Sequence, residues 1–417
     1  MRIGIMAAVL AGVLTVAAGE AAPAGEHWVS SWATSQMIAD PANALPPEQM
    51  TDSTLRQAIR LSVGGKAFRV VLSNAFGTAP LHLKGVHAAK ALSGGAIDPA
   101  SDQVLTFSGH NDVTIPAGAA FASDPVAMPV TALSDLAISI YYDTAPAVQT
   151  SHPGSRMTSY SLAGDHLADA TLAGAKTADH WYQIAAVEVL APHTVSAVVA
   201  LGDSITDGRG STTNGNDRWT NITAAALQND PKARHLGMLN AGIGGNCVLV
   251  QCLGPNALAR LERDVFAPPG VSALIVYEGV NDLGRLTIDH AVAAEEHEAL
   301  VSRLIAGYTQ IAARARAHGL KLYIATILPY GSNAYYHPTA ANEADRAAIN
   351  SWIRTQKLYD GVIDFDVATR DPVHPEKLNP AYDSGDGLHA SAAGYQVMGT
   401  LAAKVLAAKA PNAGKAK

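Results

Sequence analysis

The sequence predicts an all-β region followed by an α/β region with a parallel sheet. Up to about residue 190, short runs of alternating polar and apolar residues are separated by turn residues, and no long helical period appears. From residue 195 onward, short apolar runs alternate with helical patterns. The 417 residues are 48% hydrophobic and 16% charged, which is enough apolar material for two or three domains.

Strand-like runs mark the first region. They include residues 68–77, 81–92, 112–118 and 136–144. Short runs of this kind, with turn residues on either side, are typical of antiparallel strands. We therefore expect residues 25–192 to form a sandwich or a jelly-roll-like domain.

The second region is expected to span residues 193–410. Its strand candidates are residues 195–202, 237–242, 272–279, 321–329 and 361–365. Helical patterns occupy residues 289–319, 342–357 and 391–410. Strands joined by crossover helices form a parallel sheet that is covered on both faces. Ligands of such sheets bind beyond the carboxyl ends of the strands, so a site is expected there.

The N-terminus has the pattern of an export signal. Arg2 precedes an apolar run, and Ala22 and Ala24 form an A-x-A cleavage site. The alternative is a membrane anchor, but the run is short for a span and lacks flanking stop-transfer charges. We expect residues 1–24 to be a signal peptide and residues 411–417 a flexible tail. The mature protein is then periplasmic or extracellular, without stable membrane insertion.

Charge and cysteine content narrow the range of partners. The formal net charge is −7 and no basic stripe is present, so a nucleic-acid partner is not expected.

Cys247 and Cys252 are the 2 cysteines of the chain. In an exported protein, cysteines this close are usually oxidised, and we expect a disulfide; the alternative is two reduced core thiols. No further ligands gather near them, and neither a metal nor a cofactor is expected. The sequence does not determine the oligomeric state.

Polar groups follow most of the predicted strands of the second region. Ser204 follows the first strand, Gly245 lies in the loop after the second, and Asn281 follows the third. Asp386 and His389 come after the fifth strand, past a loop. A hydroxyl, a flexible backbone, an amide and an acid–imidazole pair are the parts needed for acyl transfer.

Ser204 alone is a weak indication, because a serine after a strand is more often a helix N-cap than a nucleophile. Gly202 is expected to let the backbone turn tightly and to hold Ser204 exposed above the sheet. His389 can take the hydroxyl proton. Asp386, three residues before His389, can fix the tautomer of the imidazole.

The negative charge that forms on an attacked carbonyl needs hydrogen-bond donors placed beforehand. Three candidates are the N–H groups of Ser204 and Gly245 and the side-chain amide of Asn281. A glycine at position 245 lets the backbone come close to the oxyanion, although it is also consistent with a merely flexible turn.

A second acid–histidine pair competes with the first. Asp371 and His374 repeat the D-x-x-H spacing between two prolines. We favour Asp386 and His389 because they stand directly before the last predicted helix.

These residues lie in four blocks, GDSITDG, NAGIGGN, EGVND and DGLH. The blocks resemble those of the SGNH hydrolases, the GDSL-type esterase superfamily, in the same order over about residues 196–408. The resemblance implies a flavodoxin-like three-layer α/β/α domain that hydrolyses esters without a metal. It also implies a catalytic triad of Ser204, Asp386 and His389. The oxyanion donors that it implies are Ser204, Gly245 and Asn281.

Further stretches, such as WVSSWATS, LSNAFGT and GRGSTTNGNDRW, are similar to exported bacterial esterases of the xylanase-associated acetylesterase group. These esterases carry an N-terminal β-domain. Glu278 departs from the superfamily, where many members have glycine, and Cys247 and Cys252 flank the oxyanion loop. Both departures are expected to reshape the mouth of the pocket.

The resulting expectation is a secreted serine esterase that removes short acyl groups, acetyl above all, from carbohydrate. Three alternatives stay open: a broad-specificity lipase or arylesterase, an acyltransferase that uses the same acyl-enzyme, and a carbohydrate-binding protein with an inert hydrolase fold. No obvious lid of large apolar residues is encoded, which favours small acyl groups.

The loop after the fourth predicted strand contains Tyr330, Tyr335 and Tyr336. It leaves the carboxyl edge of the sheet on the same side as Ser204. A tyrosine offers an apolar face together with a hydroxyl, which suits a sugar ring that carries an ester. The alternative is that these side chains pack against the neighbouring helix.

Overall fold

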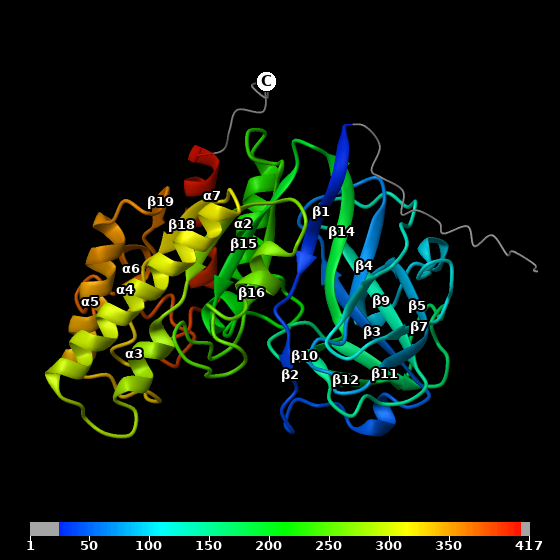
Figure 1. The fold of residues 1–417 in the computed structure, drawn as a ribbon, viewed down its shortest axis with the longest axis horizontal. Coiled ribbons are helices and arrows are strands. Elements are labelled where there is room, and N and C mark those ends of the chain that lie inside the picture. Colours follow the sequence, from blue (N-terminus) through cyan, green and yellow to red (C-terminus); the bar gives the residue numbers. More distant parts are fainter. Residues whose placement is uncertain (1–24, 410–417) are drawn as a thin grey trace, which may run out of the picture.

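The computed structural model describes residues 25–409, which form two regions that lie side by side (Figure 1). Residues 1–24 and 410–417 lie outside this range, and with them the expected signal peptide and tail. We call residues 25–192 the β region and residues 193–409 the α/β region.

The β region consists of antiparallel sheets. Its strands are β1 (Glu26–Ala33), β2 (Met37–Ile38), β3 (Ser53–Arg60), β4 (Phe68–Ser73), β5 (Leu81–Lys90), β6 (Gln103–Val104), β7 (Val113–Ile115), β8 (Ala120–Ala122), β9 (Asp135–Tyr142), β10 (Thr150–His152), β11 (Ser159–Ala163), β12 (Lys176–Ala178), β13 (Trp181–Tyr182) and β14 (Ile184–Pro192). They pair in the orders β1-β14-β4-β8, β13-β10-β2 and β12-β11-β3-β9-β5-β6, with β7 beside β5. Short 3₁₀ turns occupy Pro47–Gln49, Ser93–Gly95 and Pro99–Ser101.

The α/β region is built on one parallel sheet. Its strands are β15 (Ser196–Gly202), β16 (Leu236–Gly242), β17 (Val271–Tyr277), β18 (Lys321–Ala325) and β19 (Gly361–Ile363). Their order in the sheet is β16-β15-β17-β18-β19. This is the flavodoxin-like order. The chain first adds β16 on one side of β15, and it then crosses back to add β17, β18 and β19 on the other side. The loops after β15 and β17 therefore diverge to opposite sides and leave a crevice between them.

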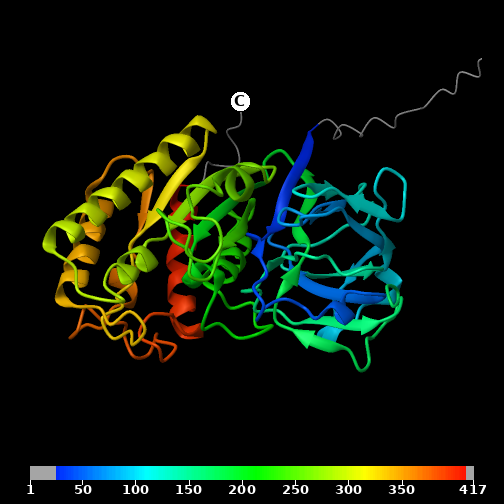
Figure 2. The same ribbon diagram turned by 60° about the horizontal axis from the view of Figure 1, so that its bottom comes forward.

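Helices cover both faces of this sheet (Figure 2). They are α1 (Ser204–Asp207), α2 (Trp219–Asn229), α3 (Val280–Leu286), α4 (Ala294–Ala317), α5 (Ala340–Thr355), α6 (Phe365–Thr369) and α7 (Ala392–Lys409), with a π-helical turn at Glu262–Phe266. Helices α2 and α7 pack together against one face, and α4 and α5 pack together against the other. The longer helices lie where the helical patterns of the sequence predicted them.

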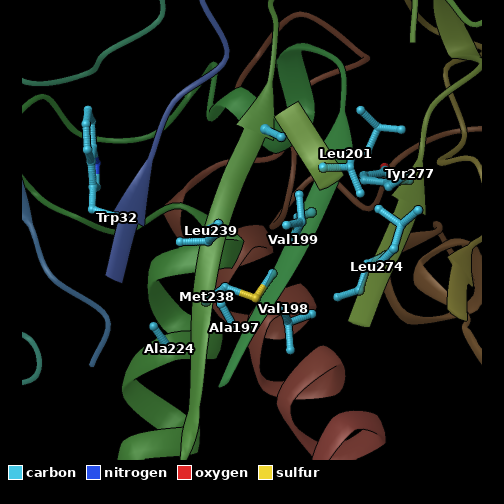
Figure 3. Packing of buried hydrophobic residues seen from close by; sticks show 14 of the residues in the cluster. Trp32, Ala197, Val198, Val199, Leu201, Ala224, Met238, Leu239, Leu274 and Tyr277 are labelled. Atoms are coloured by element: carbon cyan, nitrogen blue, oxygen red, sulfur yellow. The ribbon is translucent and has the colours of Figure 1, made fainter. Parts of the chain in front are cut away.

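The sheet strands read as almost continuous apolar runs because both of their faces are buried. Side chains of β15, including Val198, Val199 and Leu201, lie among side chains of β16 and β17 (Figure 3). Strand β1 of the β region lies against β15 and β16, and the Ser30 N–H donates to the Pro269 carbonyl at 2.9 Å. The buried apolar residues of the two regions form one continuous cluster. The β region is therefore packed onto the α/β region at the side of its first two strands.

Within residues 25–409, no helix combines the length and the hydrophobicity that a membrane crossing requires.

Candidate active site

Ser204 stands at the carboxyl end of β15, as the first residue of helix α1. Asp203 caps this short helix, because its Oδ1 accepts the N–H of Ile205 at 2.9 Å. Gly202 serves close packing and not the tight turn that we expected, since its φ is not positive. A Cβ at position 202 would lie 2.0 Å from Thr206 Oγ1. The absence of a side chain thus lets α1 sit directly on the end of the strand.

The Ser204 hydroxyl faces an imidazole. Ser204 Oγ lies 2.7 Å from His389 Nε2, and His389 Nδ1 lies 2.6 Å from Asp386 Oδ2. The other carboxylate oxygen, Asp386 Oδ1, accepts the N–H groups of Leu388 at 3.0 Å and of His389 at 2.9 Å. A carboxylate can only accept, so Nδ1 carries the ring proton and Nε2 is left to accept from the hydroxyl.

The electrostatics of Asp386 agree with that arrangement. Partial burial raises the pKa of the Asp386 carboxyl, but the hydrogen bonds from the ring and the backbone N–H of His389 outweigh burial. The net result is a pKa below the ordinary range of aspartate. Asp386 therefore stays ionised beside the imidazole at neutral pH.

Two candidate oxyanion donors lie near this hydroxyl. Gly245 has a φ of +70°, a left-handed conformation that a residue with a side chain adopts only with strain. Asn281, in the first turn of α3, donates from Nδ2 to the Asn246 carbonyl at 2.7 Å. Its Oδ1 accepts the hydroxyl of Tyr336 at 2.7 Å, which fixes the orientation of the amide. The second N–H of that amide is left for a ligand.

These groups line a cleft of about 850 Å³ between the two regions. The α/β region supplies Ser204, Gly245, Asn281 and His389 to its wall, among others. The β region supplies further lining residues, including Met37, Asp40, Asn43, His152, Arg156 and His180. The structure thus brings together every residue of the expected triad and oxyanion site, and it adds a wall from the β region.

The model of the GDSL-like lipase/acylhydrolase family matches residues 200–397, from the end of β15 into α7. This part of the chain belongs to that family. The protein is accordingly a carboxylic ester hydrolase, and the matched residues hold all the expected triad and oxyanion residues. We refer to residues 200–397 as the GDSL-like domain.

Solved structures similar to the chain include three proteins of this type. A protein of the G-D-S-L family from Desulfitobacterium hafniense is 20% identical with a TM-score of 0.38, over 51% of this chain and 99% of that one. A GDSL-like lipase from Bacteroides thetaiotaomicron is 19% identical with a TM-score of 0.36, over 52% and 89%. A carbohydrate acetylesterase from Sinorhizobium meliloti is 16% identical with a TM-score of 0.37, over 51% and 99%. No curated protein matches the chain.

One contact beside Ser204 could not be predicted from the sequence. His152, from the β region, places Nε2 2.8 Å from Asp207 Oδ1, and its Nδ1 lies 2.7 Å from the Ser35 carbonyl. Both ring nitrogens of His152 therefore face oxygen atoms of other residues. Asp207 Oδ2 accepts the N–H of Gly244 at 3.1 Å. The contact thus links the β region to helix α1 and to the loop of Gly245.

The three tyrosines of the loop after β18 have different surroundings. Tyr335 is 62% exposed and lines the cleft. Tyr336 also lines the cleft, but its hydroxyl is bonded to Asn281. Tyr330 is 1% exposed and does not reach the cleft, because it packs within the core. The packing alternative therefore describes Tyr330, and only Tyr335 presents a free face to a ligand.

Glu278 lies beneath the site and not at its mouth, where we expected it. Its side chain is fully buried, and Oε1 lies 3.2 Å from Arg260 Nη2. Arg260 also donates to the carbonyls of Gly202 at 3.0 Å and Ala241 at 2.6 Å, which end β15 and β16. Burial first, and the charge of Asp203 next, raise the pKa of Glu278 well above its usual range. The Arg260 guanidinium therefore ties β15 and β16 together near their carboxyl ends, with Glu278 beside it.

The disulfide is present and closes the loop after Gly245. Cys247 and Cys252 are bonded, with their Cα atoms 5.7 Å apart. Asp282 accepts the N–H groups of Val248 at 2.9 Å and Leu249 at 3.1 Å within the same loop. A Cβ at position 245 would lie 2.8 Å from Leu253 Cδ1. The loop is thus held at its base and presses Leu253 against Gly245.

No group of three or more His, Cys, Asp or Glu side chains suited to a metal ion occurs in the part of the chain that the structure describes.

Proposed function

We propose that the protein is an exported serine esterase that removes short acyl groups, acetyl above all, from carbohydrate. The observation that carries the proposal is the contact chain on the cleft wall. Ser204 Oγ lies 2.7 Å from His389 Nε2, and His389 Nδ1 lies 2.6 Å from Asp386 Oδ2. A hydroxyl whose proton can pass to an oriented imidazole is an activated nucleophile.

In the first half of the reaction, Ser204 Oγ attacks the ester carbonyl while its proton passes to His389 Nε2. The N–H groups of Ser204 and Gly245 and the free amide N–H of Asn281 receive the oxyanion. The tetrahedral intermediate then collapses to an acyl-enzyme. His389 returns the proton to the departing alcohol oxygen, and Asp386 stabilises the imidazolium throughout.

In the second half, a water molecule takes the place of the alcohol. His389 accepts a proton from this water, which attacks the acyl-enzyme carbonyl. The same three donors stabilise the second oxyanion, and the carboxylic acid leaves as His389 reprotonates Ser204 Oγ.

Several features support a short acyl group and a carbohydrate alcohol. Leu253 lies beside Gly245 and lines the cleft, so an apolar side chain borders the oxyanion donors. The opposite wall is polar, with Asp40, Asn43 and His180 of the β region facing the cleft. Hydrogen-bonding groups of this kind match the hydroxyls of a sugar. The disulfide and the leader-like N-terminus support export.

The proposal is tested by replacing the nucleophile. Ser204→Ala should lower kcat for nitrophenyl acetate by at least ~10⁴-fold without changing the melting temperature, because no acyl-enzyme can form. Ser211→Ala is the matched control, since its hydroxyl bonds only to the Gly208 carbonyl, at 2.6 Å. A serine-directed phosphonate should label Ser204, and hydrolysis should continue in EDTA. Labelling of another serine, or recovery by zinc after loss in EDTA, would contradict the mechanism.

The substrate is tested with esters of different sizes. Hydrolysis of nitrophenyl esters should fall as the acyl chain lengthens beyond acetyl and propionyl. Tyr335→Ala should raise KM for acetylated xylo-oligosaccharide and leave nitrophenyl acetate unaffected, since the small ester reaches only Ser204 and the oxyanion donors. Equal effects on both substrates, with a lower melting temperature, would indicate that Tyr335 serves packing instead.

A further inference from the structure

The β region extends a short segment, His152–Arg156, into the cleft that contains Ser204. His152, Pro153, Gly154 and Arg156 all line this cleft. Contacts with the GDSL-like domain hold the segment at both ends. His152 Nε2 lies 2.8 Å from Asp207 Oδ1, and the Ser155 carbonyl accepts a hydrogen bond from the Arg218 guanidinium. The segment is therefore a fixed part of the cleft wall.

Arg156 has a backbone conformation that needs an explanation. Its φ is +49°, in the left-handed region that residues other than glycine, asparagine and aspartate seldom adopt. The Arg156 carbonyl accepts the N–H of Asn214 at 2.9 Å, and Asn214 Oδ1 accepts the N–H of Thr158 at 2.8 Å. Strained residues held in place by their surroundings are concentrated at functional sites. Arg156, with this backbone conformation, lines the cleft.

The charge of Arg156 lacks a full partner. Its Nε is buried and has no hydrogen-bond partner among residues 25–409. The guanidinium of Arg218 is close enough for the charge of Arg156 to affect its pKa. Burial above all, with the charge of Arg156 in addition, lowers the pKa of Arg218 to about 10, while Asp207 acts in the opposite direction. Asp207 bonds to His152 and to the N–H of Gly244, and not to Arg156.

Arg156 lines the same cleft as His389 and Arg209. The leaving alcohol must lie next to His389, which gives it a proton. Arg209 Nε is 3.9 Å from Asp386 Oδ2. The loop that follows Arg209 leads to Asn214, whose N–H bonds to Arg156. The loop therefore connects the acid–imidazole pair to Arg156 along one rim of the cleft.

We propose that Arg156 binds a carboxylate on the alcohol portion of the ester, so that acidic esters, such as acylated sugars with a neighbouring uronic acid, are the preferred substrates. This inference rests on the proposed esterase function. The planar guanidinium matches a carboxylate with two parallel hydrogen bonds, and the fixed backbone keeps it ready for the substrate. The buried Nε–H of Arg156 is costly to leave without an acceptor, and a carboxylate would supply one.

The test uses two acetyl esters that differ in charge alone, 4-acetoxybenzoate and 4-acetoxybenzamide. The measured quantity is the ratio of their kcat/KM values, so that differences in intrinsic reactivity cancel between variants. Arg156→Gln should lower this ratio by roughly tenfold or more, as expected for a lost hydrogen bond to a charged group. Arg156→Lys should retain part of the preference, because it keeps the charge but loses the paired geometry. Arg303→Gln, at an exposed position of α4, is the matched control and should not change the ratio.

Other outcomes would overturn the inference. An unchanged ratio in Arg156→Gln, or an equal loss for both esters, would make Arg156 a structural residue. If Arg156→Gln does not fold, the salt dependence of the parent protein decides: the ratio should fall as NaCl rises from about 10 mM to about 0.5 M, and a constant ratio contradicts the subsite. If the parent protein hydrolyses neither ester, the proposed function fails. Calorimetry then tests the subsite by itself, because it predicts that the parent protein binds 4-hydroxybenzoate more tightly than 4-hydroxybenzamide.

Discussion

The GDSL-like domain contains two acid–histidine pairs with the same spacing, and only one of them faces Ser204. In the pair Asp386 and His389, the carboxylate holds the ring at 2.6 Å. In the pair Asp371 and His374, the carboxylate accepts the N–H groups of Val373 at 2.7 Å and His374 at 2.9 Å. The ring of His374 turns away to Glu376, 3.6 Å from its carboxylate, and is largely exposed. The same spacing thus produces two different arrangements of the imidazole.

The local D-x-x-H turn does not by itself bring the imidazole against the aspartate. Backbone N–H groups, first that of His374, lower the pKa of Asp371, and hydrogen bonds also bring the pKa of Asp386 below its ordinary value. The pKa shifts therefore agree in direction. The difference lies in the surroundings: Asn333 Nδ2 donates to the Asp386 carbonyl at 2.8 Å, which docks that turn against the loop after β18. The segment of Asp371 meets the same loop at another point, where the Gly331 N–H donates to the Glu376 carbonyl at 2.8 Å.

The largest expected effect comes from removing one imidazole from each pair. His389→Ala should lower kcat by about 10⁶-fold, as for the histidine of other serine hydrolases, because no base then takes the Ser204 proton. His374→Ala should stay within about twofold of the parent, since an exposed substitution away from the site has little effect. Steady-state kinetics on nitrophenyl acetate would measure both. The reverse pattern would transfer the catalytic role to the Asp371 pair.

Exchanging the carboxylates for amides should give the next largest difference. Asp386→Asn should lower kcat by about 10⁴-fold, because an amide at this position favours the wrong imidazole tautomer. Asp371→Asn should leave kcat unchanged, since its oxygen can still accept the backbone N–H groups. Melting curves would show whether either variant loses stability. A modest loss in Asp386→Asn would mean that the backbone, and not the carboxylate, orients His389.

A third pair of variants measures how much the neighbours of the Asp386 pair, apart from the imidazole, contribute to kcat. Asn281→Ala should lower kcat by roughly 10²–10³ with a smaller change in KM, as for other single oxyanion donors. Tyr336→Phe removes the hydroxyl that holds Asn281 Oδ1, so it should lower kcat by a smaller factor and leave KM almost unchanged. A pure KM effect in Asn281→Ala would make the amide a ligand of the ground-state substrate.

The last prediction concerns stability and not kcat, at Asp203, whose pKa shifts in the direction opposite to those of Asp371 and Asp386. Burial above all raises the pKa of Asp203 to about 7, although the N–H of Ile205 acts against it. A carboxyl with a raised folded-state pKa stabilises the fold below its unfolded pKa, and this contribution is lost as the pH rises to about 7. Asp203→Asn removes that dependence. Its free energy of unfolding, relative to the parent, should increase by up to about 1.4 kcal/mol per pH unit between about pH 4 and 7 and then level off.

Urea denaturation at several pH values would measure this difference. A constant gap between the Asp203→Asn variant and the parent would show that Asp203 is ionised throughout, stabilised by Arg260. The mutation keeps the oxygen that accepts the Ile205 N–H, so helix capping itself should not change.

Much of the fold was predictable from the sequence because it depends on local patterns. The apolar runs that became β15 to β18 are buried on both faces, and such runs differ clearly from the amphipathic period of α4 and α5. Parallel strands place their carboxyl ends at one edge, so groups far apart in sequence, such as Ser204 and Asn281, were expected together. The closeness of Cys247 and Cys252 along the chain likewise predicted the disulfide that the structure contains.

The residues that surround Ser204 and Asn281 depend on the tertiary structure. The contact of His152 with Asp207, the strained backbone of Arg156, the burial of Tyr330 and the position of Glu278 beneath the sheet left no mark in the sequence pattern. Each depends on how the β region packs against the α/β region, or on which side chains fill the space below the strand ends. Periodicity records which face of an element is buried, but it does not record which distant element covers that face. The position before the last helix favoured one of the two D-x-x-H spacings, and the structure shows that the imidazole of that pair meets Ser204.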